Sequence, residues 1–173
     1  MRKIPVFCFV FIFITGFCFA ADPVEGFWLS IDDKTNEVTA GWHIYQESGK
    51  LYGKLLSYTA DYPGIKASRC KDSYPGFPVA GKVSEMPVNG TPWIFGLTGD
   101  KPGEWSNGYV IDPSNGRMYK CKMFFHPAGS KVGRTTFQTD MLEMRGEIGL
   151  GIGGSQFWRK TNEATANSLW PKQ

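Results

Sequence analysis

Hydrophobic and polar positions alternate along two neighbouring segments between residues 104 and 125. Residues 117–125 show the alternation most clearly, and a period of two is typical of a strand with one buried face. The segment between the arms, residues 112–116, contains Pro, Asn and Gly. Pro presets φ for a turn, Asp and Asn bond to nearby backbone, and Gly accepts positive φ. The pattern predicts a β-hairpin with Asp112, Pro113 and Gly116 as structural turn residues.

The same signals predict further short strands and no helix in the mature chain. We expect these strands at residues 25–31, 38–46, 51–58, 91–97, 141–149 and 155–160. Sheets of this size close or stack to hide their edges. We therefore predict an all-β fold, a single antiparallel up-and-down β-barrel of about eight strands, over residues 21–160. An eight-stranded barrel holds either side chains or one small ligand inside.

Three segments lack a regular period. Residues 59–90 carry four prolines and the aromatic residues Tyr62, Tyr74 and Phe77, and a loop of this length often serves as a lid or binding loop. The alternative is a loop simply pinned to the barrel by Cys70. We expect residues 126–140 to form a long mobile connection and residues 161–173 a polar C-terminal tail.

Residues 1–20 have the composition of a secretory signal peptide. Arg2 and Lys3 precede an apolar run that ends in small residues, which predicts cleavage after Ala20 and a periplasmic or secreted protein with no stable membrane insertion after cleavage. The alternative is an uncleaved anchor, although the run is short against the roughly 20 residues of a membrane span.

Charge argues against a nucleic-acid partner. Removing residues 1–20 takes away two of the 19 basic residues and none of the 16 acidic ones, which leaves a net charge of +1. Binding to phosphates requires a basic stripe, and the sequence has no Lys/Arg cluster.

Two cysteines, Cys70 and Cys121, remain in the mature chain. In an exported protein this number suggests one disulfide. The alternative is two free thiols, with Cys121 filling a core position of its strand.

Catalytic and metal-binding patterns are weak. The two histidines, His43 and His126, are far apart in sequence, and zinc needs three or four suitably placed ligands, so we expect neither a metal nor a cofactor. Glu104 and Asp112 could form a carboxylate pair, but the turn already explains Asp112. No nucleophile–base pair is visible, and we expect no enzymatic activity.

Several ordered motifs resemble a known family. They are Gly26-Phe27-Trp28, Gly49-Lys50-Leu51-Tyr52-Gly53-Lys54, Trp105-Ser106-Asn107-Gly108-Tyr109, Arg145-Gly146-Glu147-Ile148-Gly149 and Gln156-Phe157-Trp158-Arg159-Lys160. Together they are similar to the exported bacterial family known as domain of unknown function 2147. The resemblance covers most of the mature chain and implies a small lipocalin-like or calycin-like barrel without an established activity.

A second resemblance, to lipocalins, is carried by Gly26 and Trp28 of the first strand. It implies that a basic residue near the last strand covers Trp28 at the closed end. Arg159 matches that position, and Arg145 is the second candidate.

We expect the barrel to bind a small apolar or amphipathic ligand, because barrel mouths are favoured ligand sites. The expected ligand-binding residues are Trp42, Tyr52, Trp105, Tyr119, Met123 and Arg145. The alternative is a filled barrel that serves as an interaction module in the cell envelope, with Tyr62, Tyr74 and Phe77 contacting a protein or glycan. A hydrolase is the third reading.

Overall fold

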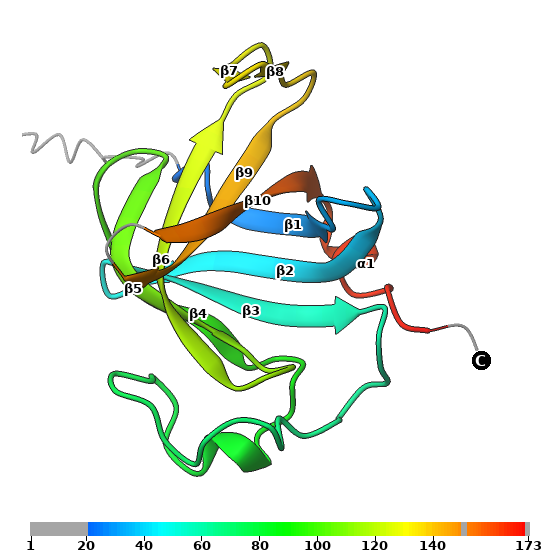
Figure 1. Ribbon diagram of the computed structural model, residues 1–173, viewed down its shortest axis with the longest axis vertical. Helices are drawn as coiled ribbons and strands as arrows, with labels where there is room; N and C mark the ends of the chain where they lie inside the picture. The colour runs from blue at the N-terminus through cyan, green and yellow to red at the C-terminus, as the bar shows by residue number, and fades with distance from the viewer. Residues whose placement is uncertain (1–20, 150–151, 172–173) are drawn as a thin grey trace, which may run out of the picture.

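The computed structural model describes residues 21–149 and 152–171, so the predicted signal peptide lies outside the described residues. Within this part of the chain, eight strands close into one antiparallel barrel (Figure 1). Their bounds are β1 Gly26–Ile31, β2 Val38–Glu47, β3 Lys50–Tyr58, β4 Pro92–Lys101, β5 Glu104–Asp112, β6 Arg117–His126, β9 Met141–Gly149 and β10 Ile152–Thr161. The predicted all-β, up-and-down barrel is confirmed.

Pairing in the barrel follows the chain order, and β1 closes the wall by pairing with β10. The β1–β2 turn, the long β3–β4 loop, the β5–β6 turn and the β9–β10 hairpin therefore meet at one end, called here the open end. The other connections lie at the opposite, closed end. None of the helices in the described residues is long and apolar enough to cross a membrane.

Inward-facing residues of the strands form the main core. They alternate with outward-facing residues, as the period of two requires. Fully or almost fully buried members from six different strands are Trp28, Ile44, Leu51, Ile94, Met123 and Trp158.

The Trp28 side chain fills the closed end of the barrel. The Trp28 side chain is completely buried, and its Nε1 donates to the Val24 carbonyl at 2.8 Å. The Lys160 ammonium lies 4.7 Å from the centre of a Trp28 ring, because Lys160 is the direct partner of Trp28 across the β1–β10 pair. The structure thus gives Lys160 the contact that the lipocalin resemblance implied for Arg159. Arg159 faces the other way along β10 and donates to Asn36 Oδ1 at 2.8 Å.

The loop between β3 and β4 has a small core of its own and covers one side of the barrel at the bottom of Figure 1. Its short 3-10 helix, η1, spans Val83–Glu85. The Phe77 ring lies 6.1 Å from Trp93 and 5.3 Å from Phe95, centre to centre. Trp93 Nε1 also donates to the Val88 carbonyl at 2.7 Å. Because the loop covers its outer face, the first half of β4 is buried on both sides.

The connection between β6 and β9 is more ordered than the sequence predicted. It forms a two-stranded sheet of β7 (Lys131–Val132) and β8 (Thr135–Thr136), which projects at the top of Figure 1. The Phe137 ring packs 5.1 Å from Phe157 and 5.6 Å from His126. Aromatic contacts with the barrel wall therefore hold this hairpin in place.

The segment after β10 also packs on the barrel. It contains one helical turn, α1 Glu163–Ala166, capped by the Asn162 side chain. Ser57 Oγ donates to the Ala166 carbonyl at 2.6 Å. Gly41 leaves the space for this contact, since a Cβ at Gly41 would overlap the Ala166 backbone.

The predicted Cys70–Cys121 disulfide is not formed, and both residues are buried free thiols. Cys70 lies in the loop, with its Cα 3.0 Å from where a Cβ on Gly116 would be. Cys121 lies five positions further along β6, about 16 Å away at roughly 3.3 Å per residue, whereas a disulfide needs Cα atoms within about 7 Å. Two cysteines in an exported chain suggest a disulfide, but their number says nothing about the distance between their Cα atoms.

Thiol titration should report this state directly. We expect both thiols to react with a thiol reagent after unfolding in denaturant without reductant, and neither to react rapidly in the native protein, because Cys121 is 1% exposed and Cys70 is 8% exposed. Burial also raises the pKa of both thiols, which lowers the reactive thiolate fraction. Finding no titratable thiol in the unfolded chain would contradict the structure.

Candidate ligand-binding site

A cavity of about 860 Å³ opens at the open end of the barrel. Residues from the barrel interior, the β3–β4 loop and the β5–β6 turn line it. The up-and-down order of the strands explains this composition. It brings the long β3–β4 loop and the short turns together at the same end of the barrel, next to the inward-facing side chains there. The cavity occupies the open half, while side chains such as Leu51, Met123 and Trp105 fill the closed half.

The floor of the cavity is a pair of stacked tryptophans. The rings of Trp42 and Trp158 lie 5.1 Å apart at an interplanar angle of 22°. Trp42 Nε1 donates to Ser30 Oγ, and Trp158 Nε1 donates to Gln156 Oε1, each at 3.3 Å. Because both indole N–H groups already have partners, the pair offers a ligand mainly apolar ring surface.

The walls combine apolar side chains with two glycines. Leu55, Val110 and Met144 line the cavity together with Tyr119. Gly146 lies beneath the Tyr119 ring, whose Cγ is 3.9 Å from where a Cβ would be. Gly154 also lines the cavity, and a Cβ there would meet no atom within 4 Å. The absence of these two side chains keeps the space open.

Tyr58 supplies a polar group without a partner. Its ring lines the cavity and contacts the Trp170 ring edge-on at 5.6 Å. Its hydroxyl is buried and forms no hydrogen bond in the described structure, and burial raises the pKa of the phenol. An unsatisfied buried donor costs about 1–3 kcal/mol, and because the hydroxyl oxygen has almost no exposed surface, a ligand in the cavity would meet other atoms of Tyr58.

The β3–β4 loop is fixed to the β5–β6 turn beside the mouth. Arg69 Nη1 donates to the Ser114 carbonyl at 2.9 Å, and the Tyr74 hydroxyl donates to the Gly116 carbonyl at 2.7 Å. Gly116 has a φ of +69°, and a Cβ on it would overlap the Arg69 carbonyl. The turn itself is held by the Asp112 carboxylate, which accepts from the Ser114 and Asn115 side chains at 2.7 and 2.6 Å.

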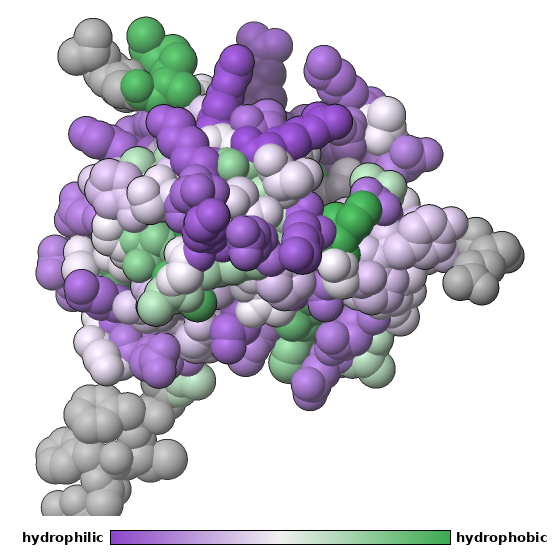
Figure 2. Space-filling model, turned by 90° about the horizontal axis from the view of Figure 1, so that it is seen from below, coloured by the Kyte–Doolittle hydropathy of each residue, from purple (hydrophilic) through white to green (hydrophobic). Residues whose placement is uncertain are grey.

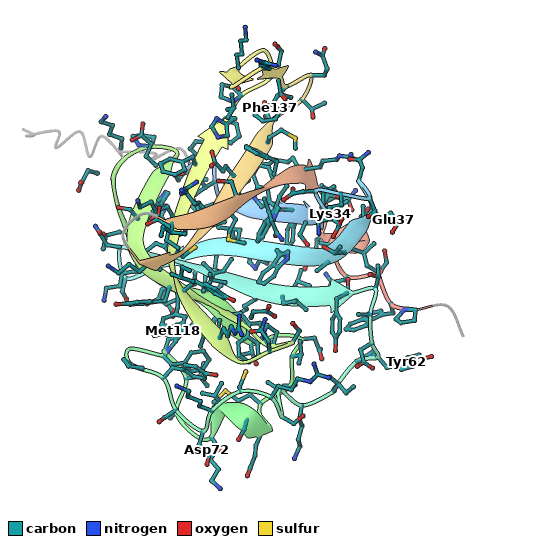
Figure 3. All side chains as sticks on the ribbon, viewed as in Figure 1. Lys34, Glu37, Tyr62, Asp72, Met118 and Phe137 are labelled. Atoms are coloured by element: carbon teal, nitrogen blue, oxygen red, sulfur yellow. The ribbon has the colours of Figure 1, made fainter. Side chains whose placement is uncertain are left out.

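The loop side of the molecule is mainly hydrophilic, with hydrophobic side chains at separate places (Figure 2). Tyr74 is only 9% exposed, and Phe77 packs inward against β4. Tyr62 is 52% exposed and points away from the barrel (Figure 3). The exposed aromatic surface predicted from Tyr62, Tyr74 and Phe77 is therefore not assembled.

The structure places the six residues expected to bind a ligand in three regions. Trp42 and Tyr119 line the cavity. Trp105 and Met123 are buried in the closed half, where they are direct partners across the β5–β6 pair. Tyr52 and Arg145 lie on the outer face of the barrel: Tyr52 stacks on Tyr45 at 5.7 Å, and Arg145 Nε donates to Glu147 Oε1 at 2.9 Å.

Apart from Trp42 and Tyr119, the cavity residues were not among the expected ligand-binding residues, and Tyr58, Gln156 and Trp158 are examples. The alternation of Gly154, Gln156 and Trp158 along β10 could have indicated two of them, because these positions share the inward face. Tyr58 ends β3, and nothing in the sequence shows that its hydroxyl is buried beside a cavity.

A polar network on the outer face of β6, β9 and β10 does not form a catalytic triad. Ser155 Oγ donates to Glu143 Oε1 at 2.5 Å, and Glu143 Oε2 lies 2.8 Å from His126 Nε2. The carboxylate thus sits between the serine and the histidine, whereas a triad needs the histidine in the middle to take the serine proton. Within the described residues, no group of three or more His, Cys, Asp or Glu side chains is placed to hold a metal ion.

Comparison with solved structures supports the barrel fold. The chain is similar to the structure titled "Protein HP1028 from the human pathogen Helicobacter pylori belongs to the lipocalin family", with a TM-score of 0.61 and 12% sequence identity. The match covers 84% of this chain and 87% of that one. At this identity the likeness concerns the fold alone. No curated protein matches the sequence.

Comparison with family models gives a match over residues 26–160, which begins with β1 and ends within β10. The matched family is described as "Uncharacterized protein conserved in bacteria (DUF2147)". As the match takes in all but the last residue of the barrel strands and more than half of the chain, this protein belongs to the bacterial DUF2147 family.

Proposed function

We propose that this protein is an exported, non-enzymatic carrier that binds one small hydrophobic or amphipathic molecule inside its barrel. The observation that carries the proposal is the cavity of about 860 Å³ with the stacked Trp42–Trp158 floor. Small-molecule sites typically have about 300–1,000 Å³, apolar walls and a few placed polar groups. A filled barrel, the alternative interpretation, would lack such a space.

Export is the second part of the proposal. The basic start, apolar run and small residues of residues 1–20 support secretion, so the carrier would act in the periplasm or outside the cell. A water-filled compartment is where an apolar molecule needs a protein to shield it.

The lining suggests how a ligand would be oriented. Its apolar part would pack on Trp42 and against Leu55, Val110 and Met144, where burial stabilises by about 25 cal/mol per Å² before the entropic costs of binding. Gln156 would select a ligand with a hydrogen-bonding group near that wall. The mouth, which carries Lys66 and Asp61, would keep the polar end of an amphipathic ligand in contact with water.

Filling the cavity from Gly154 should abolish binding without breaking the fold. A Trp at position 154 starts in open space and points inward, so we expect its indole to occupy the ligand site. The neutral fluorescent probe N-phenylnaphthylamine should bind the unmodified protein and bind Gly154→Trp at least about tenfold more weakly, a change of about 1.4 kcal/mol. Fluorescence titration measures the affinity, and circular dichroism checks that the barrel is retained.

Two control variants separate cavity filling from other effects. Gly154→Ala adds one methyl group in the same place and should leave the affinity nearly unchanged. Ile152→Trp adds the same large ring on the same strand, at a residue that is 63% exposed and does not line the cavity. If the unmodified protein does not bind the probe, or if a folded Gly154→Trp binds it normally, the proposal fails.

A further inference from the structure

We infer that a second hollow beside the cavity mouth is a subsite for the anionic head group of the bound molecule. This inference rests on the proposed function, because the apolar part of the same molecule would lie in the barrel. The hollow has a volume of about 490 Å³ and lies between the β3–β4 loop, the start of β6 and the end of β9. Its lining residues are Lys71, Ser73, Tyr74, Pro75, Gly116, Arg117, Met118, Tyr119 and Ile148.

The hollow adjoins the cavity along one path. Tyr119 lines both spaces. On one side of the path, the β5–β6 turn gives Ser114 to the cavity and Gly116 to the hollow. On the other side, β9 gives Gly146 to the cavity and Ile148 to the hollow. A chain that leaves the barrel between the turn and the β9–β10 hairpin therefore passes Tyr119 and reaches the hollow.

The charged side chains that line the hollow are positive. Lys71 and Arg117 contribute two positive charges, and none of the described residues that line the hollow is acidic. Neither basic side chain forms an ion pair or hydrogen bond among the described residues. Lys71 and Arg117 are thus available to a ligand.

The nearest acidic side chains in sequence are engaged elsewhere. Asp72 accepts a hydrogen bond from Ser84 Oγ and lies 3.9 Å from the Lys82 ammonium, at the end of the loop that is far from the barrel (Figure 3). The Asp112 carboxylate is used within its own turn by Ser114 and Asn115. Neither carboxylate needs to be displaced before an anion binds.

The backbone that carries the two basic residues is held in place. The Tyr74 hydroxyl accepts from the Lys71 N–H at 2.9 Å and donates to the Gly116 carbonyl at 2.7 Å. Arg117, next in the chain, donates its N–H to Asn115 Oδ1 at 2.9 Å. Tyr74 therefore links the two sides of the hollow, and the backbone positions from which the two basic side chains extend are set before a ligand arrives. The apolar side chains of Met118 and Ile148 would contact the first carbons of the chain next to the head group.

The subsite predicts a preference for anionic amphiphiles that depends on Lys71 and Arg117. Dodecanoate, dodecyl phosphate and dodecanol have the same chain and differ in head group, and each can be measured by displacement of N-phenylnaphthylamine. We expect the unmodified protein to bind the two anions about five- to tenfold more tightly than dodecanol, in line with partly exposed ion pairs. The preference should shrink as salt screens the charges.

The double variant Lys71→Met/Arg117→Met should lose this preference and keep its affinity for dodecanol. The control variant Lys50→Met/Lys131→Met removes the same net charge at the closed end and should behave like the unmodified protein. A preference for dodecanoate alone would assign a carboxylate head group, and a preference for dodecyl phosphate alone would assign a phosphate.

Three results would overturn the subsite. They are equal binding of all three probes by the unmodified protein, an anion preference that survives in the double variant, and a double variant that binds dodecanol as poorly as it binds the anions. In the first two cases dodecanol binding would still support the carrier. If none of the three molecules binds, the proposed function fails and takes the subsite with it.

Discussion

Trp28→Ala is expected to lower the free energy of unfolding by about 3–5 kcal/mol, the usual loss when a large aromatic side chain is removed from a core. Trp28 is completely buried, and it joins the segment before β1 to the barrel through its hydrogen bond to Val24. Its ring also supports the Lys160 side chain and contacts Phe125 edge-on at 6.4 Å. Removing it leaves a large void at the closed end. Denaturant titration followed by circular dichroism measures the change.

Two further variants divide this effect into its parts. Trp28→Phe keeps most of the apolar area but loses the donor to Val24, so we expect a smaller loss of about 1–3 kcal/mol. Lys160→Met keeps the covering aliphatic stem and loses the cation–π contact, which is worth about 0.5–1 kcal/mol at an exposed site. It also loses the long hydrogen bonds from Lys160 Nζ to the Pro23 and Glu25 carbonyls, at 3.4 and 3.3 Å. If Trp28→Ala lowered the free energy of unfolding by no more than Lys160→Met does, the closed end would not be tightly packed around Trp28.

The strands were predictable because their evidence is local. A period of two along β2, β3 and β6, with turn residues such as Asp112 and Gly116 between strands, depends only on near neighbours in sequence. The β3–β4 loop was not predictable in detail. Its order comes from contacts such as Phe77 with Phe95 and Tyr74 with Gly116, which join residues that no sequence period connects.

Sequence patterns did not identify which single residue covers Trp28 at the closed end. The resemblance to lipocalins correctly indicated a basic cover for Trp28 near the last strand, but it pointed to Arg159. Adjacent residues of a strand face opposite sides, so an error of one position moves a side chain from one face of the wall to the other. The β1–β10 register, which pairs Trp28 with Lys160, decides between the two residues, and the sequence alone does not contain it.

Which residues line the cavity also depends on how the strands pair, and the sequence alone does not give this pairing. Aromatic residues on strands predicted an apolar interior, and Trp42 and Tyr119 do line the space. Tyr52 lies on the outer face because its direct partner across β2–β3 is Tyr45, which also faces outward. Strand pairing decides where the large aromatic rings and the glycines lie relative to each other, and their positions determine which half of the barrel interior is empty.

Gly116→Ala is expected to destabilise the protein by about 2–4 kcal/mol and to loosen the loop beside the cavity mouth. The φ of +69° alone costs a residue with a Cβ about 1–2 kcal/mol. The overlap with the Arg69 carbonyl adds to this cost, since a Cβ fits only if the loop backbone moves. Gly49→Ala is the matched control, because Gly49 sits in a hairpin turn at φ +73° with nothing within 4 Å of its would-be Cβ.

The difference between the two variants therefore isolates the contact between loop and turn. Gly49→Ala should cost only the conformational part, and its loop should resist proteases as in the unmodified protein. Gly116→Ala should be cleaved faster within residues 59–91, because the anchors at Arg69 and Tyr74 depend on the same turn. It should also weaken the anion preference more than it weakens dodecanol binding, since Lys71 is positioned through Tyr74 and Gly116. Equal stability and equal proteolysis of the two variants would show that the loop is held by its aromatic contacts with β4 and not by the turn.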